Sequence, residues 1–247
     1  MKYLTEPKKT IWVASNLEKR ILIDRILNSD ACLSDMDDTD TKSTASIVVI
    51  EGVKRYFYNP HFIQWWLKIG WDQLTKRRKL DSNSWADYNK LFLDEKEKRR
   101  IARKVTPKKI KKLLFPGVEE FYSLIKTQKV YITRNLHEIS SAFGELLNFD
   151  QVISRSRNKE QSTISFIETH PQFCNYIVKG DSVHDEGMID ALKFYQKKGR
   201  INSITGIWVS KTPTENPKFD VNIGQDYRGL VELLKKEKPI KLFSDEY

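Results

Sequence analysis

Three short apolar runs in the sequence end in polar side chains that could do chemistry together. The runs are Ala31–Leu33, VYI before residue 133, and Tyr176–Val178. The polar residues that follow them are four aspartates and one threonine: Asp35, Asp37, Asp181, Asp185 and Thr133. The carboxyl ends of neighbouring parallel strands meet at one edge of a sheet, so these side chains would share a crevice. Carboxylates this close repel each other without a cation, and oxygen ligands beside an anionic substrate indicate Mg2+.

The elements that must position these residues alternate between strand and helix in the second half of the chain. We expect strands at 129–132, 151–153, 176–178, 205–209 and 219–223. We expect helices at 118–126, 139–147, 162–169, 188–197 and 227–236. Alternation of this kind is typical of an α/β fold whose mostly parallel sheet is covered by helices on both faces.

The first half of the chain contains two further segments. Residues 1–29 are interpreted as an N-terminal helical extension, with an amphipathic helix from about Ser15. Residues 44–113 hold 18 Lys or Arg against seven Asp or Glu, whereas the whole chain carries +10, so the basic charge belongs to this segment. We expect four or five helices in it, although the β-branched run Ile47–Ile50 could form a short strand. The core then comprises residues 30–43 and 114–247.

Composition bounds the class of protein. The chain has 247 residues, of which 39% are hydrophobic, and this excludes a collagenous or wholly disordered protein. No stretch reaches the roughly 18 apolar residues of a membrane-spanning helix, and the charged N-terminus lacks a secretory apolar region. Cys32 and Cys174 lie in apolar segments and are expected to be free thiols. We therefore expect a soluble, cytoplasmic protein without a membrane partner.

Four motifs in order resemble the haloacid dehalogenase superfamily of phosphotransfer enzymes, in its phosphatase branch. Asp35-Met36-Asp37-Asp38-Thr39 matches the Asp-x-Asp-x-Thr motif, and Thr133 ends the strand of the second motif. Lys159 matches the third motif, and Gly180-Asp181-Ser182-Val183-His184-Asp185 matches the fourth. The resemblance covers residues 31 to about 236, with a gap for the basic insert. It implies a Rossmann-like three-layer core and a smaller all-helical cap domain formed by residues 44–113.

The resemblance also implies a role for each motif residue. Asp35 is the nucleophile that forms an aspartyl-phosphate, and Asp37 protonates the leaving oxygen and then activates water. Thr133 donates a hydrogen bond to the transferring phosphoryl group, and Lys159 neutralises charge on that group and on Asp35.

The resemblance further implies a Mg2+ site and contacts to substrate. Mg2+ is held by Asp35, the backbone carbonyl of Asp37 and Asp181. Asp185 either binds the ion through water or orients Lys159. Arg134 and Asn135 are candidate substrate-binding residues, with a solvated loop as the alternative.

Some positions depart from the usual family pattern. Asp40 stands where an apolar residue is usual, and Ser34 precedes the nucleophile, so both bear on local packing and activity. Lys179 is a second lysine near the site, and the assignment of the site lysine is open between it and Lys159. His184, inside the fourth motif, is interpreted as a surface histidine.

The sequence therefore predicts a Mg2+-dependent phosphomonoester hydrolase that acts on a small, soluble phosphorylated metabolite. One alternative is a phosphatase on nucleotide or nucleic-acid ends, because basic and aromatic residues alternate in the insert. They are Arg55, Tyr56, Tyr58, Trp65, Trp66, Trp71, Lys76, Arg77, Arg78 and Lys79. The tryptophans are also typical of a cap core, and a nucleic-acid partner is not favoured. Another alternative is a catalytically silent, basic binding module of the same fold.

Overall fold

A computed structural model of the chain describes residues 2–3, 11–13, 17–42, 107–211 and 216–236, together with residues 44, 60, 63, 64, 67 and 100. The chain forms two compact units, one of Met1–Lys42 with Leu113–Tyr247 and one of Ser43–Lys112. These bounds lie next to the expected limits of the insert at 44 and 113. In the second unit, helix α6 spans Pro107–Lys111. The basic and aromatic residues expected between 55 and 79, and the strand considered at Ile47–Ile50, lie outside the described residues.

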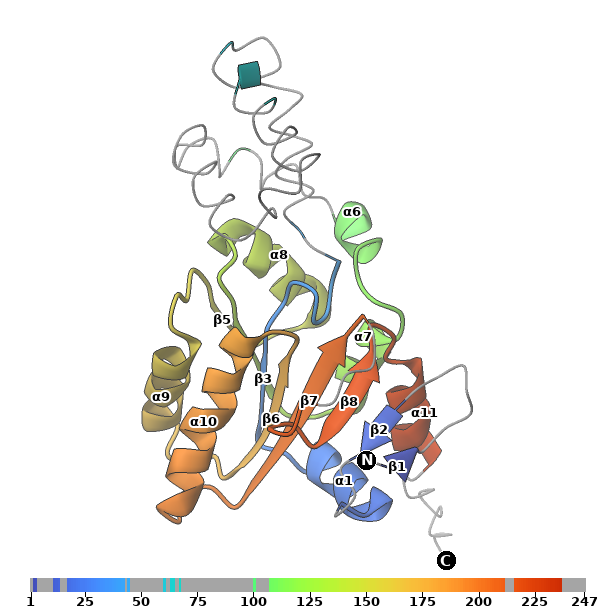
Figure 1. Cartoon of the computed structure of the whole chain (residues 1–247), viewed down its shortest axis with the longest axis vertical. Coiled ribbons are helices and arrows are strands. Elements are labelled where there is room, and N and C mark those ends of the chain that lie inside the picture. Colours follow the sequence, from blue (N-terminus) through green and yellow to red (C-terminus); the bar gives the residue numbers. More distant parts are fainter. Residues whose placement is uncertain are drawn as a thin grey trace, which may run out of the picture. The chain divides into compact units, whose positions relative to one another are not determined.

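The first unit is built on an eight-stranded sheet in the order β1-β2-β8-β7-β6-β3-β4-β5 (Figure 1). The strands are β1 Lys2–Tyr3, β2 Ile11–Val13, β3 Ala31–Ser34, β4 Gln128–Ile132, β5 Gln151–Ile153, β6 Asn175–Gly180, β7 Ser203–Ser210 and β8 Val221–Gly224. The six strands from β8 to β5 are parallel, whereas β1 and β2 pair antiparallel at one edge. The mostly parallel sheet predicted from the sequence is confirmed.

Helices cover both faces of this sheet, as the alternating pattern predicts (Figure 1). They are α1 Lys19–Leu27, α7 Val118–Leu124, α8 His137–Leu147, α9 Lys159–Thr169, α10 Val183–Lys197 and α11 Arg228–Lys236. Helices α9 and α10 pack together on one face and bury a core with β3, β4, β6 and β7. Helices α7, α11 and α1 pack on the other face. None of the described helices is long and apolar enough to cross a membrane.

The N-terminal segment differs from the helical extension that we expect over residues 1–29. Helix α1 begins at Lys19, later than Ser15, and buries Leu22, Ile23 and Ile26. Before it, β2 extends the sheet by pairing with β8, and β1 pairs with β2. The expectation was wrong because Ile11 and Val13 follow the two-residue period of a strand, while the pairing that fixes them comes from β8, far along the chain.

Strand β3 lies at the point where the direction of the sheet order reverses. The chain leaves β3, adds β4 and β5 on one side, and returns to place β6, β7 and β8 on the other. All four β3 residues are fully buried, as expected for a central parallel strand. Ligands of open α/β sheets bind beyond the carboxyl ends of strands at such a switch point, so the loops after β3, β4 and β6 define the place to search.

One glycine fixes how the loop after the insert enters α7. Gly117 has a φ of +83°, a conformation that residues with a Cβ rarely adopt. A Cβ there would also lie 2.7 Å from the backbone nitrogen of Arg228. The glycine therefore permits α7 to start against the beginning of α11.

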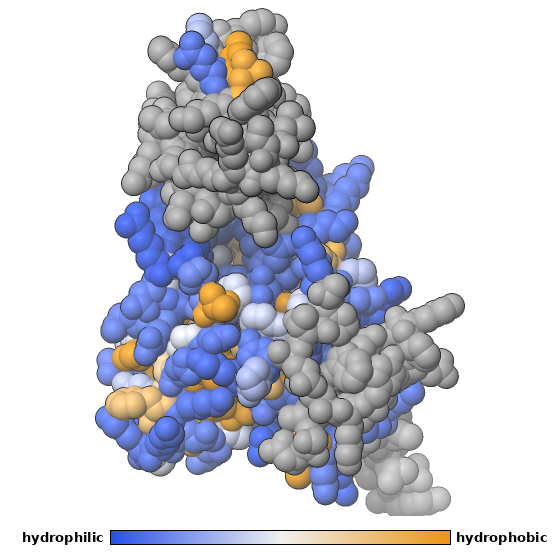
Figure 2. Space-filling view, in the orientation of Figure 1, coloured by the Kyte–Doolittle hydropathy of each residue, from blue (hydrophilic) through white to orange (hydrophobic). Residues whose placement is uncertain are grey.

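On the face that Figure 2 shows, hydrophilic side chains cover most of the described surface. The large apolar side chains that are described as exposed in the first unit are separate ones, namely Ile21, Val183 and Phe194. Isolated apolar residues of this kind are normal on a folded domain.

Candidate active site

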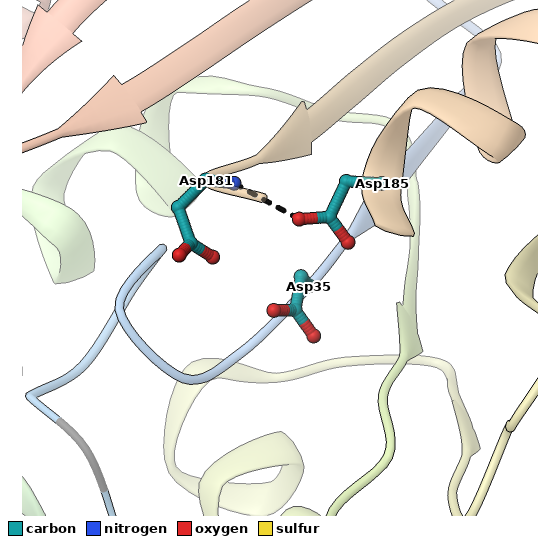
Figure 3. A group of neighbouring side chains, drawn as sticks. All are labelled: Asp35, Asp181 and Asp185. Carbon is teal, nitrogen blue, oxygen red and sulfur yellow. Dashed lines mark hydrogen bonds between the residues drawn. The ribbon is translucent and has the colours of Figure 1, made fainter. Parts of the chain in front are cut away.

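Three carboxylates converge at the carboxyl end of the central strands (Figure 3). Asp35 directly follows β3, Asp181 directly follows β6, and Asp185 lies in the first turn of α10. One oxygen of each carboxylate lies within 4.8 Å of the others. Of the four aspartates that the sequence predicts to lie together, the structure brings these three close to one another. An arrangement of three acidic side chains within this distance is a candidate cation site.

A buried lysine joins two of these carboxylates. Lys159 is the first residue of α9 and is 5% exposed. Its Nζ lies 2.7 Å from Oδ1 of Asp35 and 2.5 Å from Oδ1 of Asp185. The Asn158 side chain caps this helix start by accepting a hydrogen bond from the Gln161 amide. The structure thus places Lys159 at the site, whereas Lys179 forms an ion pair with Asp40.

Asp185 is held firmly from both of its oxygens. Oδ2 accepts hydrogen bonds from the backbone amides of Asp181 and Ser182, at 3.0 and 2.9 Å, and Oδ1 accepts from Lys159. Ser182 and Asp185 form a capping box at the start of α10. A Cβ on Gly180 would lie 2.2 Å from Cβ of Asp185, so only glycine fits before this turn. These contacts favour the second of the two expected roles of Asp185, which is to orient Lys159.

The loop after β3 turns back on itself between Asp35 and Thr41. The amides of Asp40 and Asp38 donate to the carbonyls of Met36 and Thr41, at 2.9 and 2.7 Å. Asp38 adopts a φ of 57°, which aspartate tolerates better than most residues. Thr39 donates a 2.9 Å hydrogen bond to Oδ1 of Asp181, and so connects the β3 loop to the end of β6. We assigned no role to Thr39 from the sequence, although it completes the first motif.

Asp37 and Thr133 lie beside this group. The carboxylate of Asp37 is outside the three-carboxylate group and accepts a 3.0 Å hydrogen bond from the Asn135 side chain. Its expected contribution to a metal is the backbone carbonyl, so this position of the side chain is compatible with the prediction. Thr133 directly follows β4, is 2% exposed, and accepts a hydrogen bond from the Asn135 amide at 3.3 Å. Asn135 therefore supports both residues.

Arg134, the second candidate substrate-binding residue, lies at the surface. Arg134 is exposed, and its Nη2 lies 3.3 Å from Nδ1 of His184, which is also exposed. The two side chains extend from the loop after β4 and from the start of α10. The exposure of His184 agrees with its interpretation as a surface residue. Its contact with Arg134 could not be predicted from the sequence, because the two residues are far apart in the chain.

Burial and mutual repulsion oppose the ionised form of two of the aspartates. Burial raises the pKa of Asp35 to about 7, although the Lys159 ammonium opposes the rise and Asp185 adds to it. Burial, together with the charges of Asp35 and Asp185, raises the pKa of Asp181 to about 8. A divalent cation bound between the carboxylates would stabilise both anions. The oxygen-only donor set fits Mg2+, which is commonly held by one or two carboxylates, waters and a phosphate.

No family model matches the sequence, and no curated protein matches it. Among solved structures, cytosolic 5'-nucleotidase IIIB bound to cytidine is similar over 88% of this chain and 90% of its own, with a TM-score of 0.50 and 16% identity.

Two other structures match with lower TM-scores. The HAD-hydrolase YfnB of Bacillus subtilis bound to magnesium is 14% identical, with 84% and 99% of the two chains covered and a TM-score of 0.46. Substrate-bound phosphoserine phosphatase is 12% identical, with 83% and 98% covered and a TM-score of 0.46. The sheet order and the likeness to the 5'-nucleotidase agree with the resemblance carried by the four motifs. The core of the chain therefore has a Rossmann-like α/β fold, similar to that of the 5'-nucleotidase.

Proposed function

We propose that this chain is a Mg2+-dependent phosphomonoester hydrolase that works through an aspartyl-phosphate on Asp35. The observation that carries the proposal is the convergence of Asp35, Asp181 and Asp185 at the switch point of the sheet, with Lys159 in contact with Asp35 and Asp185. A carboxylate beside a buried ammonium and two further carboxylates is suited to phosphoryl transfer, because the nucleophile and the compensating charges are already in place.

Mg2+ would be held by Asp35, Asp181 and the backbone carbonyl of Asp37, and it would neutralise charge on the phosphate as the nucleophile approaches. Asp185 would act on the site through Lys159, whose ammonium it contacts at 2.5 Å. This assignment follows from the occupied oxygens of Asp185, both of which already accept hydrogen bonds.

The protein side chains account for each step of the reaction. An oxygen of Asp35 attacks phosphorus while the bond from phosphorus to the leaving oxygen breaks, and Asp37 gives that oxygen its proton. Asp37 then removes a proton from the water that attacks phosphorus, which frees Asp35 and inorganic phosphate. Asn135 holds Asp37 in place through the 3.0 Å hydrogen bond. Thr133 and Lys159 donate hydrogen bonds to the phosphoryl oxygens.

We propose a small, soluble phosphorylated metabolite as the substrate and the cytoplasm as the location. Arg134 is exposed next to Thr133 and provides a positive charge for the part of the substrate beyond the phosphate. The basic segment 44–113 is proposed as the cap that selects substrate. Because this segment is strongly basic and would attract anionic substrates, we propose nucleotides and oligonucleotide ends as the second substrate class.

The experiment is a release assay for inorganic phosphate over a panel of phosphomonoesters. The panel contains sugar phosphates, nucleoside monophosphates, a 5'-phosphorylated oligonucleotide and an aryl phosphate, each with Mg2+ or with EDTA. We expect release that requires Mg2+ and disappears in Asp35→Asn. Lack of release from every compound would refute the hydrolase. Oligonucleotide binding that survives Asp35→Asn without any turnover would instead support the silent binding module.

A further inference from the structure

The Asp40 carboxylate is the centre of a buried polar network under the candidate active site. Asp40 and Lys179 are both 0% exposed, and Lys179 Nζ lies 2.5 Å from Oδ1 of Asp40. Four hydroxyl groups also lie within hydrogen-bond distance of this carboxylate, and they belong to Ser34, Tyr122, Tyr131 and Tyr227. Burial of an ion pair is expensive unless hydrogen bonds satisfy it, and this pair is surrounded by donors.

The aromatic rings around Lys179 complete its surroundings. Nζ lies 4.2 Å from the ring centroid of Tyr122, 4.7 Å from that of Tyr227 and 5.0 Å from that of Phe121. Burial first, and then the charge of Asp40, raise the pKa values of the Tyr122 and Tyr227 hydroxyls well above the usual range. These hydroxyls therefore remain protonated donors at neutral pH. The ammonium of Lys179 and the hydroxyls of Ser34, Tyr122, Tyr131 and Tyr227 therefore surround the Asp40 carboxylate inside the core.

The register of the sheet places this network one residue before the active site. Ser34 is paired with Lys179 on β6 and with Tyr131 on β4, so the three residues form a row across adjacent strands. Along β3 the residue after this row is Asp35, and along β6 it is Gly180, which precedes Asp181. Ser34 and Lys179 therefore lie just before the loops that carry Asp35 and Asp181.

Direct contacts connect the network to the nucleophile. The backbone amide of Asp35 donates to the carbonyl of Lys179 at 3.0 Å. The Ser34 hydroxyl lies 2.6 Å from the carbonyl of Asp35 and 3.1 Å from Oδ2 of Asp40. Tyr227 lies within 3.0 Å of both the Thr39 carbonyl and Oδ1 of Asp40. Both ends of the Asp35–Thr41 loop are therefore attached to the same buried charge pair.

We propose that Asp40 and Lys179 are positioning residues that hold Asp35 and Asp181 at the separation needed for one cation and one phosphate. Asp40 belongs to the loop of Asp35, and Lys179 belongs to the strand that leads to Asp181. The ion pair joins these two segments under the site, whereas Thr39 joins them beside it. The kinetic test of this inference rests on the proposed function, whereas the metal-binding test does not depend on it.

The test separates positioning from stability with a set of variants. Asp40→Asn and Lys179→Met each leave one buried charge without its partner, and both are expected to unfold more easily. The double variant Asp40→Asn/Lys179→Met has no unpaired charge and keeps an oxygen that can accept from the tyrosines. We expect it to be more stable than either single variant. Ile204→Ala, in the core at the start of β7, is the control for a loss of stability away from the site.

The readouts are kcat and KM at a temperature where circular dichroism shows full folding, and Mn2+ affinity by electron paramagnetic resonance without substrate. We expect the double variant to lose about tenfold or more in kcat with a smaller change in KM, because a misplaced nucleophile lowers the rate more than it weakens binding. We expect its Mn2+ affinity to fall as well. Ile204→Ala should retain both values while it is folded.

A milder pair of variants covers the case in which the charge variants do not fold. Tyr227→Phe removes the hydroxyl that contacts Asp40 and Thr39, and we expect at least threefold weaker Mn2+ binding. Tyr195→Phe is the matched control, because its hydroxyl contacts Glu168 at the surface. Wild-type kcat and Mn2+ affinity in the double variant, or in Tyr227→Phe if the double variant does not fold, would overturn the positioning role.

The outcome for the wild type separates this inference from the proposed function. Wild-type protein that binds Mn2+ but releases no phosphate from any compound would refute the hydrolase, while the Mn2+ affinities of the variants still decide the positioning role. Wild-type protein that binds no Mn2+ would overturn both proposals.

Discussion

Replacement of Lys159 by methionine should make stability strongly dependent on pH and on divalent cations. Lys159 is 5% exposed and contacts Asp35 and Asp185 at 2.7 and 2.5 Å. Burial lowers its pKa, but the two carboxylates outweigh burial, and the net pKa lies above the usual value. Removal of one member of a buried ion pair typically costs about 3–5 kcal/mol, because a buried charge then lacks its partner.

For a chain of 247 residues, about 1 kcal/mol corresponds to a change of roughly 2–4 °C in Tm. Lys159→Met should therefore lower Tm by about 6–20 °C at pH 8 in EDTA. In the variant, burial and repulsion no longer meet an opposing ammonium, so the pKa of Asp35 rises above about 7. The deficit should shrink as the pH falls below 7, since the carboxylates then bind protons and lose their charge. Mg2+ should reduce the deficit at pH 8 by supplying positive charge.

The assay is thermal and urea unfolding followed by circular dichroism at several pH values, with EDTA or Mg2+. Lys218→Met is the matched control, because this lysine also contacts two carboxylates, those of Glu186 and Asp190, but its side chain is 38% exposed. Its replacement should cost less than about 1 kcal/mol. Equal effects of the two substitutions, or a Lys159→Met deficit that is the same at every pH, would refute the reasoning.

Three further predictions concern the same core. In EDTA, ionisation of Asp35 and Asp181 should destabilise the folded state as pH rises from about 4 to 8, because burial raises their pKa values from the usual 3.8 to about 7 and about 8 in the folded state. Urea unfolding of the wild type and of Asp35→Asn/Asp181→Asn at several pH values measures this effect, and an equal pH dependence of the two unfolding free energies would contradict it. Gly117→Ala should lower the free energy of unfolding by more than about 2 kcal/mol, because the new Cβ meets both a positive φ and a backbone atom at 2.7 Å. Gly199→Ala should lower it by about 1–2 kcal/mol, because φ is +73° there but the space around the new Cβ is free. Thermal unfolding of the two variants measures the difference. Thr39→Val should weaken Mn2+ binding severalfold by removing the hydrogen bond to Asp181, with surface Thr169→Val unchanged, and equal affinities would exclude that role.

The sheet could be predicted from the sequence because its strands are locally marked. The central strands β3, β4 and β6 each contain a short apolar run, and the residues that follow these strands carry the motif side chains. The proximity of Asp35 and Asp181 then follows, because the carboxyl ends of neighbouring parallel strands meet at one edge of the sheet. The edge strand β2 could not be predicted with the same ease, since only its pairing with β8 stabilises it.

The choice between the two candidate lysines depended on tertiary contacts. Lys159 and Lys179 both lie near motif residues in the sequence, but they lie on different elements and have different partners. Asp40, which departs from the usual family pattern, and Lys179 are satisfied by one another. Sequence spacing could not show this, because the two residues are 139 positions apart and meet only when β3 and β6 pair.

The measurement that tests the central claim most directly is detection of a phosphoryl group on Asp35. The protein would be mixed with an aryl phosphate and Mg2+, quenched in acid, and treated with borohydride, which reduces an acyl phosphate to the alcohol. Peptide mass spectrometry would then locate the modified aspartate. The account predicts reduction at Asp35, dependent on Mg2+ and absent in Asp35→Asn. Phosphate release without modification at Asp35, or modification at another residue, would contradict it.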